Sequence, residues 1–124
     1  MGPRGAYAAV GYLEVQGAAF GIKALDAACK GAAVHILETN TVCPNKFTIL
    51  FTGTLAEVQT AHDKACQAVG GRMYDSIVIG NIHRDIVKAL AHDFSCPGVA
   101  KGGEALGVLE CLTTASGIKA LDAA

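Results

Sequence analysis

The chain has 124 residues, which suits one domain of ordinary size, and 52% of them are hydrophobic, so a disordered chain is excluded. Ten basic and eleven acidic residues leave a net charge of −1, without a basic block or a tryptophan, which argues against a nucleic-acid-binding protein. No apolar run is long enough to span a bilayer, and Glu14 interrupts the N-terminal stretch before a signal-peptide core forms, so we expect a cytosolic protein.

The hydrophobic pattern predicts alternating strands and helices. In chain order we expect a strand at 7–15, a helix at 17–31, strands at 33–38 and 46–53, a helix at 55–69, a strand at 75–80 and a helix at 84–92. The order β-α-β-β-α-β-α predicts an α/β (α+β) sandwich of ferredoxin-like topology, with one helical layer on an antiparallel or mixed sheet.

Two local patterns indicate the buried side of the first predicted helix and the ends of the second. Apolar residues recur in the first helix at Phe20, Ile22, Leu25 and Cys29. Thr54 and Glu57 have the spacing of a capping box for the second helix, which Gly70-Gly71 is expected to end. Surplus alanine and glycine favour close packing of the elements.

The stretch "TNTVCPNKF", residues 39–47, lies between two apolar runs and reads as a loop. Its cysteine, Cys43, precedes a proline, and proline restricts the residue before it to extended conformations. We therefore expect a thiol held on a stiff, exposed loop, where it is placed to bind or react.

The chain has five cysteines, an odd count that indicates thiols more than a disulfide framework. Cys29 and Cys66 fall in expected helices and Cys111 in an expected strand, so all three read as packing residues. Cys96, in the glycine- and proline-rich "SCPG", reads as part of a turn, while a second ligand or redox site stays an alternative.

A repeat is the most informative feature of the chain. Residues 105–124 align without a gap with residues 9–28, and "GIKALDAA" is identical in both. The repeat predicts a first domain at 5–94, a linker at 95–103 and the incomplete start of a second domain at 104–124. One strand and one helix cannot bury their apolar faces alone. They must pack on the first domain, swap into another chain, stay disordered, or belong to an incomplete sequence.

Four segments together resemble a known family: "AVGYLEVQG", "GIKALDAACKGAAV", "TVCPNKF" and "DSIVIGNIH". They are similar to the bacterial microcompartment (BMC) shell domain, and most similar to the N-terminal half of tandem-domain shell proteins of the propanediol-utilisation type. The resemblance covers residues 7–92 and resumes at 104.

The resemblance implies a flat, non-enzymatic tile of a shell in the cytoplasm. Its partners would be copies of itself, in a cyclic homotrimer or hexamer, and other shell proteins, with small metabolites crossing a pore and no nucleic acid or lipid membrane involved. The implied pore-lining residues are Thr41, Val42, Cys43, Pro44, Asn45 and Lys46. Cys43 thiolates from symmetry-related chains would ligate a [4Fe–4S] cluster, as thiolates do in such centres.

Some positions depart from the family pattern or have a second interpretation. Asn45 replaces the usual glycine after Cys-Pro, and asparagine tolerates the left-handed conformation that glycine would adopt there. Lys30 matches a tile-edge lysine but also suits a helix end. Asn81 replaces an edge arginine, and His83 reads as structural or edge-forming.

The four histidines, His35, His62, His83 and His92, show no metal-binding spacing, and His62-Asp63 reads as a solvated helix face. Two other functions stay open: a tile with an open, cluster-free pore, and a trimeric ferredoxin-like regulator that binds a small effector. No nucleophile–base pair or paired carboxylates indicate an enzyme.

Overall fold

The computed structural model describes residues 9–91, 102–103, 105 and 107–124; His92 and Cys96 therefore lie outside the described residues. The strands are β1 (Ala9–Gln16), β2 (His35–Val42), β3 (Lys46–Gly53) and β4 (Met73–Gly80), and they form one sheet in the order β2-β3-β1-β4. The helices are α1 (Ala18–Gly31), α2 (Leu55–Val69), the 3-10 turn η1 (Gly70–Arg72), α3 (Arg84–Leu90) and α4 (Thr114–Ala123).

The expected fold class is confirmed, and the sheet is antiparallel at every strand pair. One boundary was wrong: β2 runs to Val42, although residues from Thr39 onward were expected to form a loop. Thr39 and Thr41 pair with Ile49 and Phe47 of β3, and β-branched threonines suit such a pairing. None of the described helices is long and apolar enough to cross a membrane.

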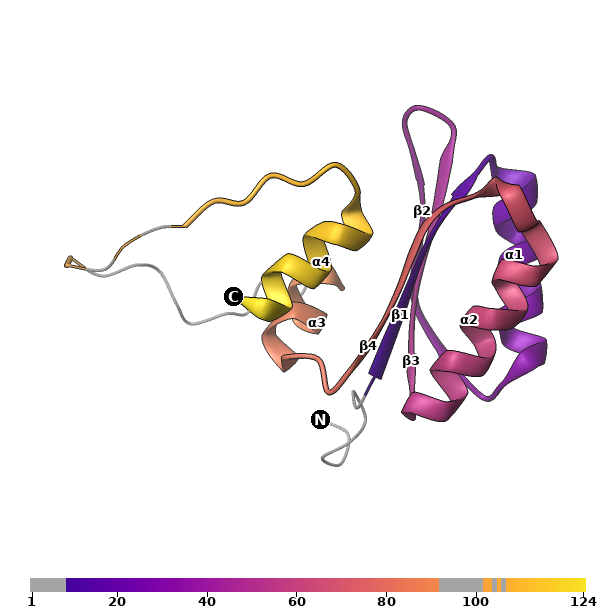
Figure 1. Ribbon diagram of the computed structural model, residues 1–124, viewed down its shortest axis with the longest axis horizontal. Coiled ribbons are helices and arrows are strands. Elements are labelled where there is room, and N and C mark those ends of the chain that lie inside the picture. The colour runs from indigo at the N-terminus through magenta and orange to yellow at the C-terminus, as the bar shows by residue number, and fades with distance from the viewer. Residues whose placement is uncertain (1–8, 92–101, 104, 106) are drawn as a thin grey trace.

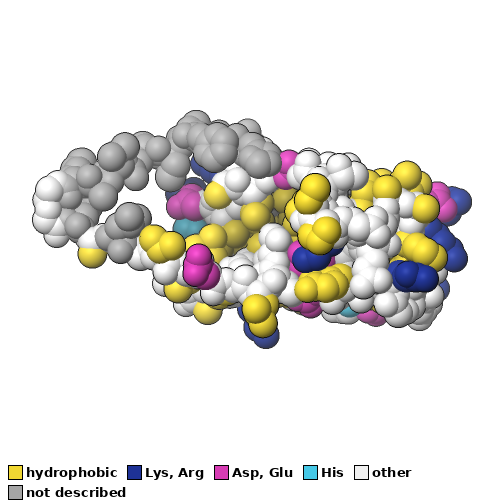
Figure 2. Space-filling view, turned by 90° about the horizontal axis from the view of Figure 1, so that it is seen from above, with side chains coloured by type: hydrophobic (Ala, Val, Ile, Leu, Met, Phe, Trp, Pro, Cys, Tyr) yellow, Lys and Arg dark blue, Asp and Glu magenta, His cyan; other side chains and the backbone are white. Residues whose placement is uncertain are grey.

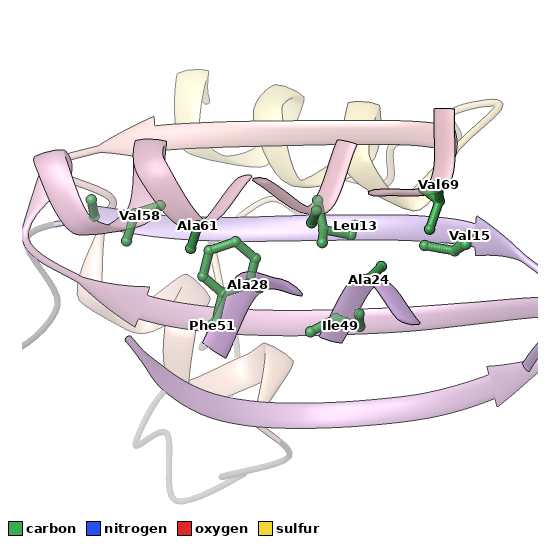
Figure 3. Packing of buried hydrophobic residues seen from close by; sticks show 11 residues of the cluster. Leu13, Val15, Ala24, Ala28, Ile49, Phe51, Val58, Ala61 and Val69 are labelled. Carbon is green, nitrogen blue, oxygen red and sulfur yellow. The ribbon is translucent and has the colours of Figure 1, made fainter. Parts of the chain in front are cut away.

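Helices α1 and α2 cover one face of the sheet and form the larger core with β1 and β3 (Figures 1 and 3). Helix α1 contacts this core through Gly21, Ala24 and Ala28, whereas Phe20 and Ile22 are 37% and 58% exposed. Of the apolar residues expected to mark the buried face, Leu25 packs against the core, whereas Phe20 and Ile22 are turned away from it. A Cβ atom on Gly21 would lie 2.3 Å from the Phe47 ring, so only a small residue permits this approach.

The capping box of α2 is confirmed. The Thr54 hydroxyl accepts a hydrogen bond from the Glu57 amide at 3.3 Å, and the Glu57 carboxylate accepts one from the Thr54 amide at 2.9 Å. The hydrogen bond that the Thr54 amide donates to the Glu57 carboxylate, and after it the interaction with the Thr54 side chain, hold the pKa of Glu57 below its ordinary value. The helix ends before Gly70, which has a φ of 52° that glycine adopts without strain.

Helices α3 and α4 lie on the opposite face of the sheet (Figure 1). The sequence predicted helices on one face only, so this second helical layer corrects that prediction. The N-terminus of α4 docks on Glu14 of β1, a carboxylate only 2% exposed. Glu14 accepts hydrogen bonds from the amides of Thr114 and Ala115 at 3.4 and 3.2 Å. The Thr113 hydroxyl also donates to Asp75 of β4. The free amides at the start of a helix thus supply hydrogen-bond donors to a buried carboxylate.

The repeated sequence folds differently in its second copy. Residues 107–112 form no strand, and Leu109 is 62% exposed, while its counterpart Leu13 is buried. These residues pair with none of the four strands of the sheet. The helix of the repeat, α4, does form, and it packs on the sheet of the first domain. The domain boundaries at 94 and 104 stay a prediction.

The surface carries no dominant sign of charge in the view of Figure 2. Both acidic and basic side chains lie among the hydrophobic ones there, with Lys and Arg more frequent at the right-hand end of the view. This distribution agrees with the net charge of −1.

The identical octapeptides of α1 and α4 provide a matched test of the close packing at Gly21. We expect Gly21→Ala to lower the free energy of unfolding by about 1–3 kcal/mol, because the new methyl group meets the Phe47 ring. Gly117→Ala should raise it by about 0.5–1 kcal/mol, because its nearest neighbour, Cys111, leaves 3.9 Å of room and alanine favours the helix. Urea unfolding of both variants measures the difference, and equal effects would contradict this packing.

Candidate functional site

The hairpin of β2 and β3 projects beyond the neighbouring helices at one end of the sheet (Figure 1). Val42 pairs with Lys46, which leaves Cys43, Pro44 and Asn45 as the turn. The structure thus places Cys43 in a three-residue turn and not within the longer loop that the sequence predicted.

The turn is held by backbone geometry that the sequence anticipates. Asn45 has a φ of 53°, so the expectation that asparagine supports a left-handed turn here is confirmed. Its carbonyl oxygen accepts a hydrogen bond from the Gly17 amide at 2.8 Å. Gly17, at the junction of β1 and α1, has a φ of 82°. The tip is therefore tied to the first strand–helix junction, a contact that the sequence did not indicate.

The residues expected to line a pore are contiguous at this tip. Thr41, Val42, Cys43, Pro44 and Asn45 are exposed, and Lys46 is half-buried. The Lys46 ammonium lies 3.9 Å from the centre of the Tyr74 ring, a cation–π contact across β1 to β4. The tip therefore presents the Cys43 thiol among both polar and apolar side chains, while the Lys46 ammonium is held against the Tyr74 ring.

Cys43 is a free, exposed thiol. No group of three or more His, Cys, Asp and Glu side chains that could hold a metal ion occurs within the described part of the chain. One copy therefore supplies a single thiolate at the tip. A cluster there requires thiolates from other copies, which the chemistry of an exposed cysteine permits.

The expected edge residues lie at the other end of the sheet. Gly80 pairs with Ala9, at the opposite end of β1 from the pairing with Lys46, and Asn81 follows Gly80 with a φ of 54°. The ammonium of Lys30, in the last turn of α1, contacts Asp26 at 2.7 Å.

His83 begins α3 at that same end. Its imidazole accepts a hydrogen bond from the Asp85 amide at 3.3 Å, and its own amide donates to Asp122 of α4 at 3.0 Å. These contacts support its structural interpretation. The edge roles of Lys30, Asn81 and His83 stay predictions, as does the pore role of the tip.

Other expectations for the cysteines and histidines were wrong. Cys29 and Cys111 are exposed and not packing residues, because α1 turns Cys29 away from the core and residue 111 lies outside any strand. The solvated face expected at His62-Asp63 holds for Asp63, which is 56% exposed, but not for His62, whose side chain is 18% exposed and faces Ser76 and Cys66. The His62–Cys66 spacing of four residues was the sequence signal for this proximity.

The backbone of Asn45 gives a test of the turn. Asn45→Gly should leave the free energy of unfolding nearly unchanged, whereas Asn45→Val should lower it by about 1–2 kcal/mol, because a β-branched residue resists a positive φ. Thr41→Val adds the same side chain to the exposed strand and serves as control. Chemical unfolding compares the three variants, and equal stability of Asn45→Val and Thr41→Val would contradict the turn geometry.

The comparisons with known proteins agree with one another. A family model described as the BMC domain matches residues 9–82. The chain is 34% identical over 116 residues to the bacterial microcompartment shell protein PduT of Citrobacter freundii, covering 94% of this chain and 61% of that protein. The crystal structure of a microcompartment protein from Desulfitobacterium hafniense DCB matches with a TM-score of 0.65 and 32% identity, over 68% of this chain and 47% of that one. The chain therefore spans about three fifths of its curated relative, and it belongs to the BMC domain family.

Proposed function

We propose that this chain is a structural tile of a bacterial microcompartment shell and that Cys43, from symmetry-related copies, ligates a [4Fe–4S] cluster at the tile's pore. The observation that carries the proposal is the exposed Cys43 thiol at the tip of a projecting hairpin. The tile serves electron transfer or cluster exchange across the shell of a cytoplasmic compartment.

The arrangement of the two ends of the domain supports a tile. The hairpin tip lies at one end of the sheet, and the expected edge residues Lys30, Asn81 and His83 lie at the other. A cyclic assembly with the tips toward the axis leaves these residues at the rim, where neighbouring tiles meet. The relative PduT is a shell protein, and the BMC domain match places this chain in the same family.

The residues at the tip fit an iron–sulfur cluster in their donor chemistry. Cys43 supplies a thiolate, the ligand that such clusters use, and its turn is fixed by Asn45 and Gly17. Three copies would supply three thiolates, as the resemblance to tandem shell proteins implies. The cluster, when bound, supplies a centre that accepts and releases one electron. The protein's part is to hold the thiols at fixed positions.

The same tip also fits the second candidate function, a pore without a cluster. Thr41 and Asn45 are exposed polar side chains, and the Lys46 charge is engaged with Tyr74. Such a lining favours the passage of small polar metabolites. The BMC domain match argues against the third candidate, a ferredoxin-like regulator that binds a small effector.

One measurement can report both the number of copies in the ring and the presence of a bound cluster. We expect native mass spectrometry of the chain, reconstituted with iron and sulfide without oxygen, to show a cyclic oligomer that carries the mass of one cluster. Cys43→Ser should keep the oligomer and lose the cluster mass, because it removes the thiolate ligand and no core contact.

Cys29→Ser is the matched control, because Cys29 is also a free, exposed thiol but lies on α1 away from the tip. It should keep the cluster mass. An oligomer without the mass in every sample would favour the open pore. A monomer in every sample would contradict the tile for this chain.

A further inference from the structure

A small cavity lies on the sheet face that α3 and α4 cover, over the half of the sheet that β2, β3 and β1 form. The sheet supplies Tyr12, Glu38, Asn40, Thr48 and Leu50 to its lining. The C-terminal end of α3 closes it with Ala89 and Leu90. Its volume is about 210 Å³, below the roughly 300–1,000 Å³ of pockets that enclose drug-sized ligands, so it suits a ligand of metabolite size.

The strand register brings the polar lining residues together. Leu50 of β3 pairs with Glu38 of β2 and with Tyr12 of β1, and Thr48 pairs with Asn40 of β2. Side chains of paired residues lie on the same face of a sheet, and residues two apart on one strand share that face. The four polar side chains therefore form two neighbouring rows around the apolar Leu50.

A bulge in β2 turns Glu38 toward this cavity. Ile36 pairs with Phe51, whose ring lies in the α1–α2 core, and a regular ladder would then place Glu38 opposite Ile49 of the same core. One extra residue in β2 instead leaves both Leu37 and Glu38 on the α3–α4 side. Bulges re-aim side chains in this way and are common beside functional sites.

Two of the polar groups are buried hydroxyls. Tyr12 is 8% exposed and Thr48 is 4% exposed. Burial raises the pKa of Tyr12, the nearby charges of Glu14 and Glu38 add to this rise, and hydrogen bonds with Thr48 and Thr114 oppose it. Tyr12 is therefore a neutral hydroxyl at neutral pH. The Thr48 hydroxyl also lies 3.5 Å from the Asn40 carbonyl oxygen, at the long limit of a hydrogen bond.

We propose that this cavity binds a small organic cation, a primary ammonium group on a short apolar chain. Of the residues that line the cavity, Glu38 alone is charged, which favours a cation and disfavours an anion. An ammonium group has three donors and no acceptor, and the Glu38 carboxylate and the hydroxyl oxygens of Tyr12 and Thr48 are acceptors. Leu50 and Leu90 provide apolar contacts for the chain.

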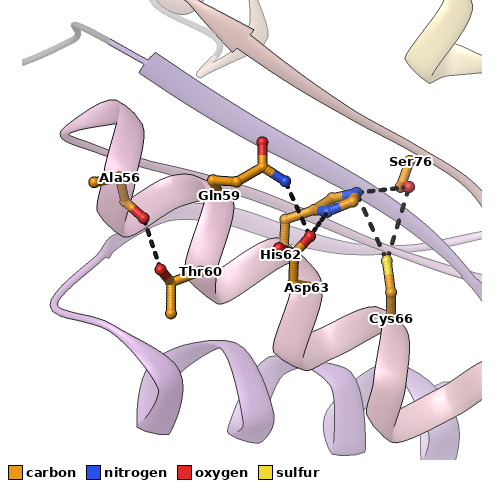
Figure 4. A network of polar contacts seen from close by, with 7 residues as sticks. All are labelled: Ala56, Gln59, Thr60, His62, Asp63, Cys66 and Ser76. Atoms are coloured by element: carbon orange, nitrogen blue, oxygen red, sulfur yellow. Dashed lines mark hydrogen bonds and ion pairs between the residues drawn. The ribbon is translucent and has the colours of Figure 1, made fainter.

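The other polar cluster of the domain, between α2 and β4, does not indicate a ligand (Figure 4). His62 Nε2 lies 2.9 Å from the Ser76 hydroxyl, and His62 Nδ1 lies 3.1 Å from the Asp63 carboxylate. Asp63 also accepts a hydrogen bond from the Gln59 amide at 2.9 Å. These groups are hydrogen-bonded to one another and line none of the cavities described above or beside α4, so the cluster joins α2 to the sheet.

An ammonium group can belong to a free amine or to a lysine of another copy of the chain. We assign the cavity to a free amine, because the sheet and the end of α3 already enclose it within one chain. The site goes beyond the proposed function, since it involves neither Cys43 nor a cluster.

The test uses three probes that share one carbon chain and differ in the head group: butylammonium, butanol and butyrate. Each is titrated into the full, isotope-labelled chain while NMR follows the backbone amide signals. We expect butylammonium to shift the signals of Glu38, Asn40 and Thr48 saturably. Butanol should bind about tenfold more weakly, because it lacks a charge-assisted hydrogen bond, and butyrate should leave these signals unchanged.

Glu38→Gln should weaken butylammonium binding about tenfold and leave butanol binding nearly unchanged, because it removes the charge and keeps the shape of the side chain. Leu90→Ala should weaken the binding of both probes by similar factors. Asp26→Asn is the matched control, because Asp26 is an exposed carboxylate on α1, on the other side of the sheet. It should leave both affinities unchanged, and the spectra report that each variant is folded.

Equal affinities for the three probes would overturn the proposal, as would butylammonium binding that survives Glu38→Gln at full strength. Each probe is also compared with the protein alone at rising concentration. Shifts of the same signals without any probe would place a second copy in the cavity, and would overturn its assignment to a free amine.

Discussion

Strand β1 is hydrogen-bonded to β3 on one side and to β4 on the other, and helices cover both of its faces. Every residue from 9 to 15 is buried as a result. Alternation along the strand sends Leu13 into the α1–α2 core and Glu14 to the α4 side. A shift of one residue in register would exchange these two side chains, so the pairing of β1 fixes what each layer of the molecule can contain.

The hairpin site depends on the same pairing. The register of β3 against β1 brings Lys46 beside Gln16, and the Gly17 amide then reaches the Asn45 carbonyl. A turn of three exposed residues is thereby attached to the most buried strand of the molecule. This attachment gives a precise position to the Cys43 thiol, which makes no packing contact in the core, and a fixed position is what ligation across several copies requires.

The repeated octapeptide separates local from tertiary causes. Both copies of "GIKALDAA" are helical, because the residues are the same and helix propensity is local. They bury opposite sides, however: Gly21 and Ala24 are buried in α1, whereas Ile118 is buried in α4 and its counterpart Ile22 is exposed. The surface that each helix packs against decides which of its sides is buried. Helix α1 meets the bulky Phe47 ring, whereas α4 meets a sheet face that accepts a larger side chain.

The sequence by itself determined the features that depend on neighbours within a few residues. The Thr54–Glu57 capping box, the left-handed Asn45 and the order of the elements through α3 were all predictable, because caps, turns and hydrophobic periods are local. The motifs also identified the family. Only the tertiary structure decided that β2 extends to Val42, that His62 faces Ser76 of β4, and that residues 107–112 form no strand. Each of these depends on a partner far along the chain, whose presence and register no local pattern encodes.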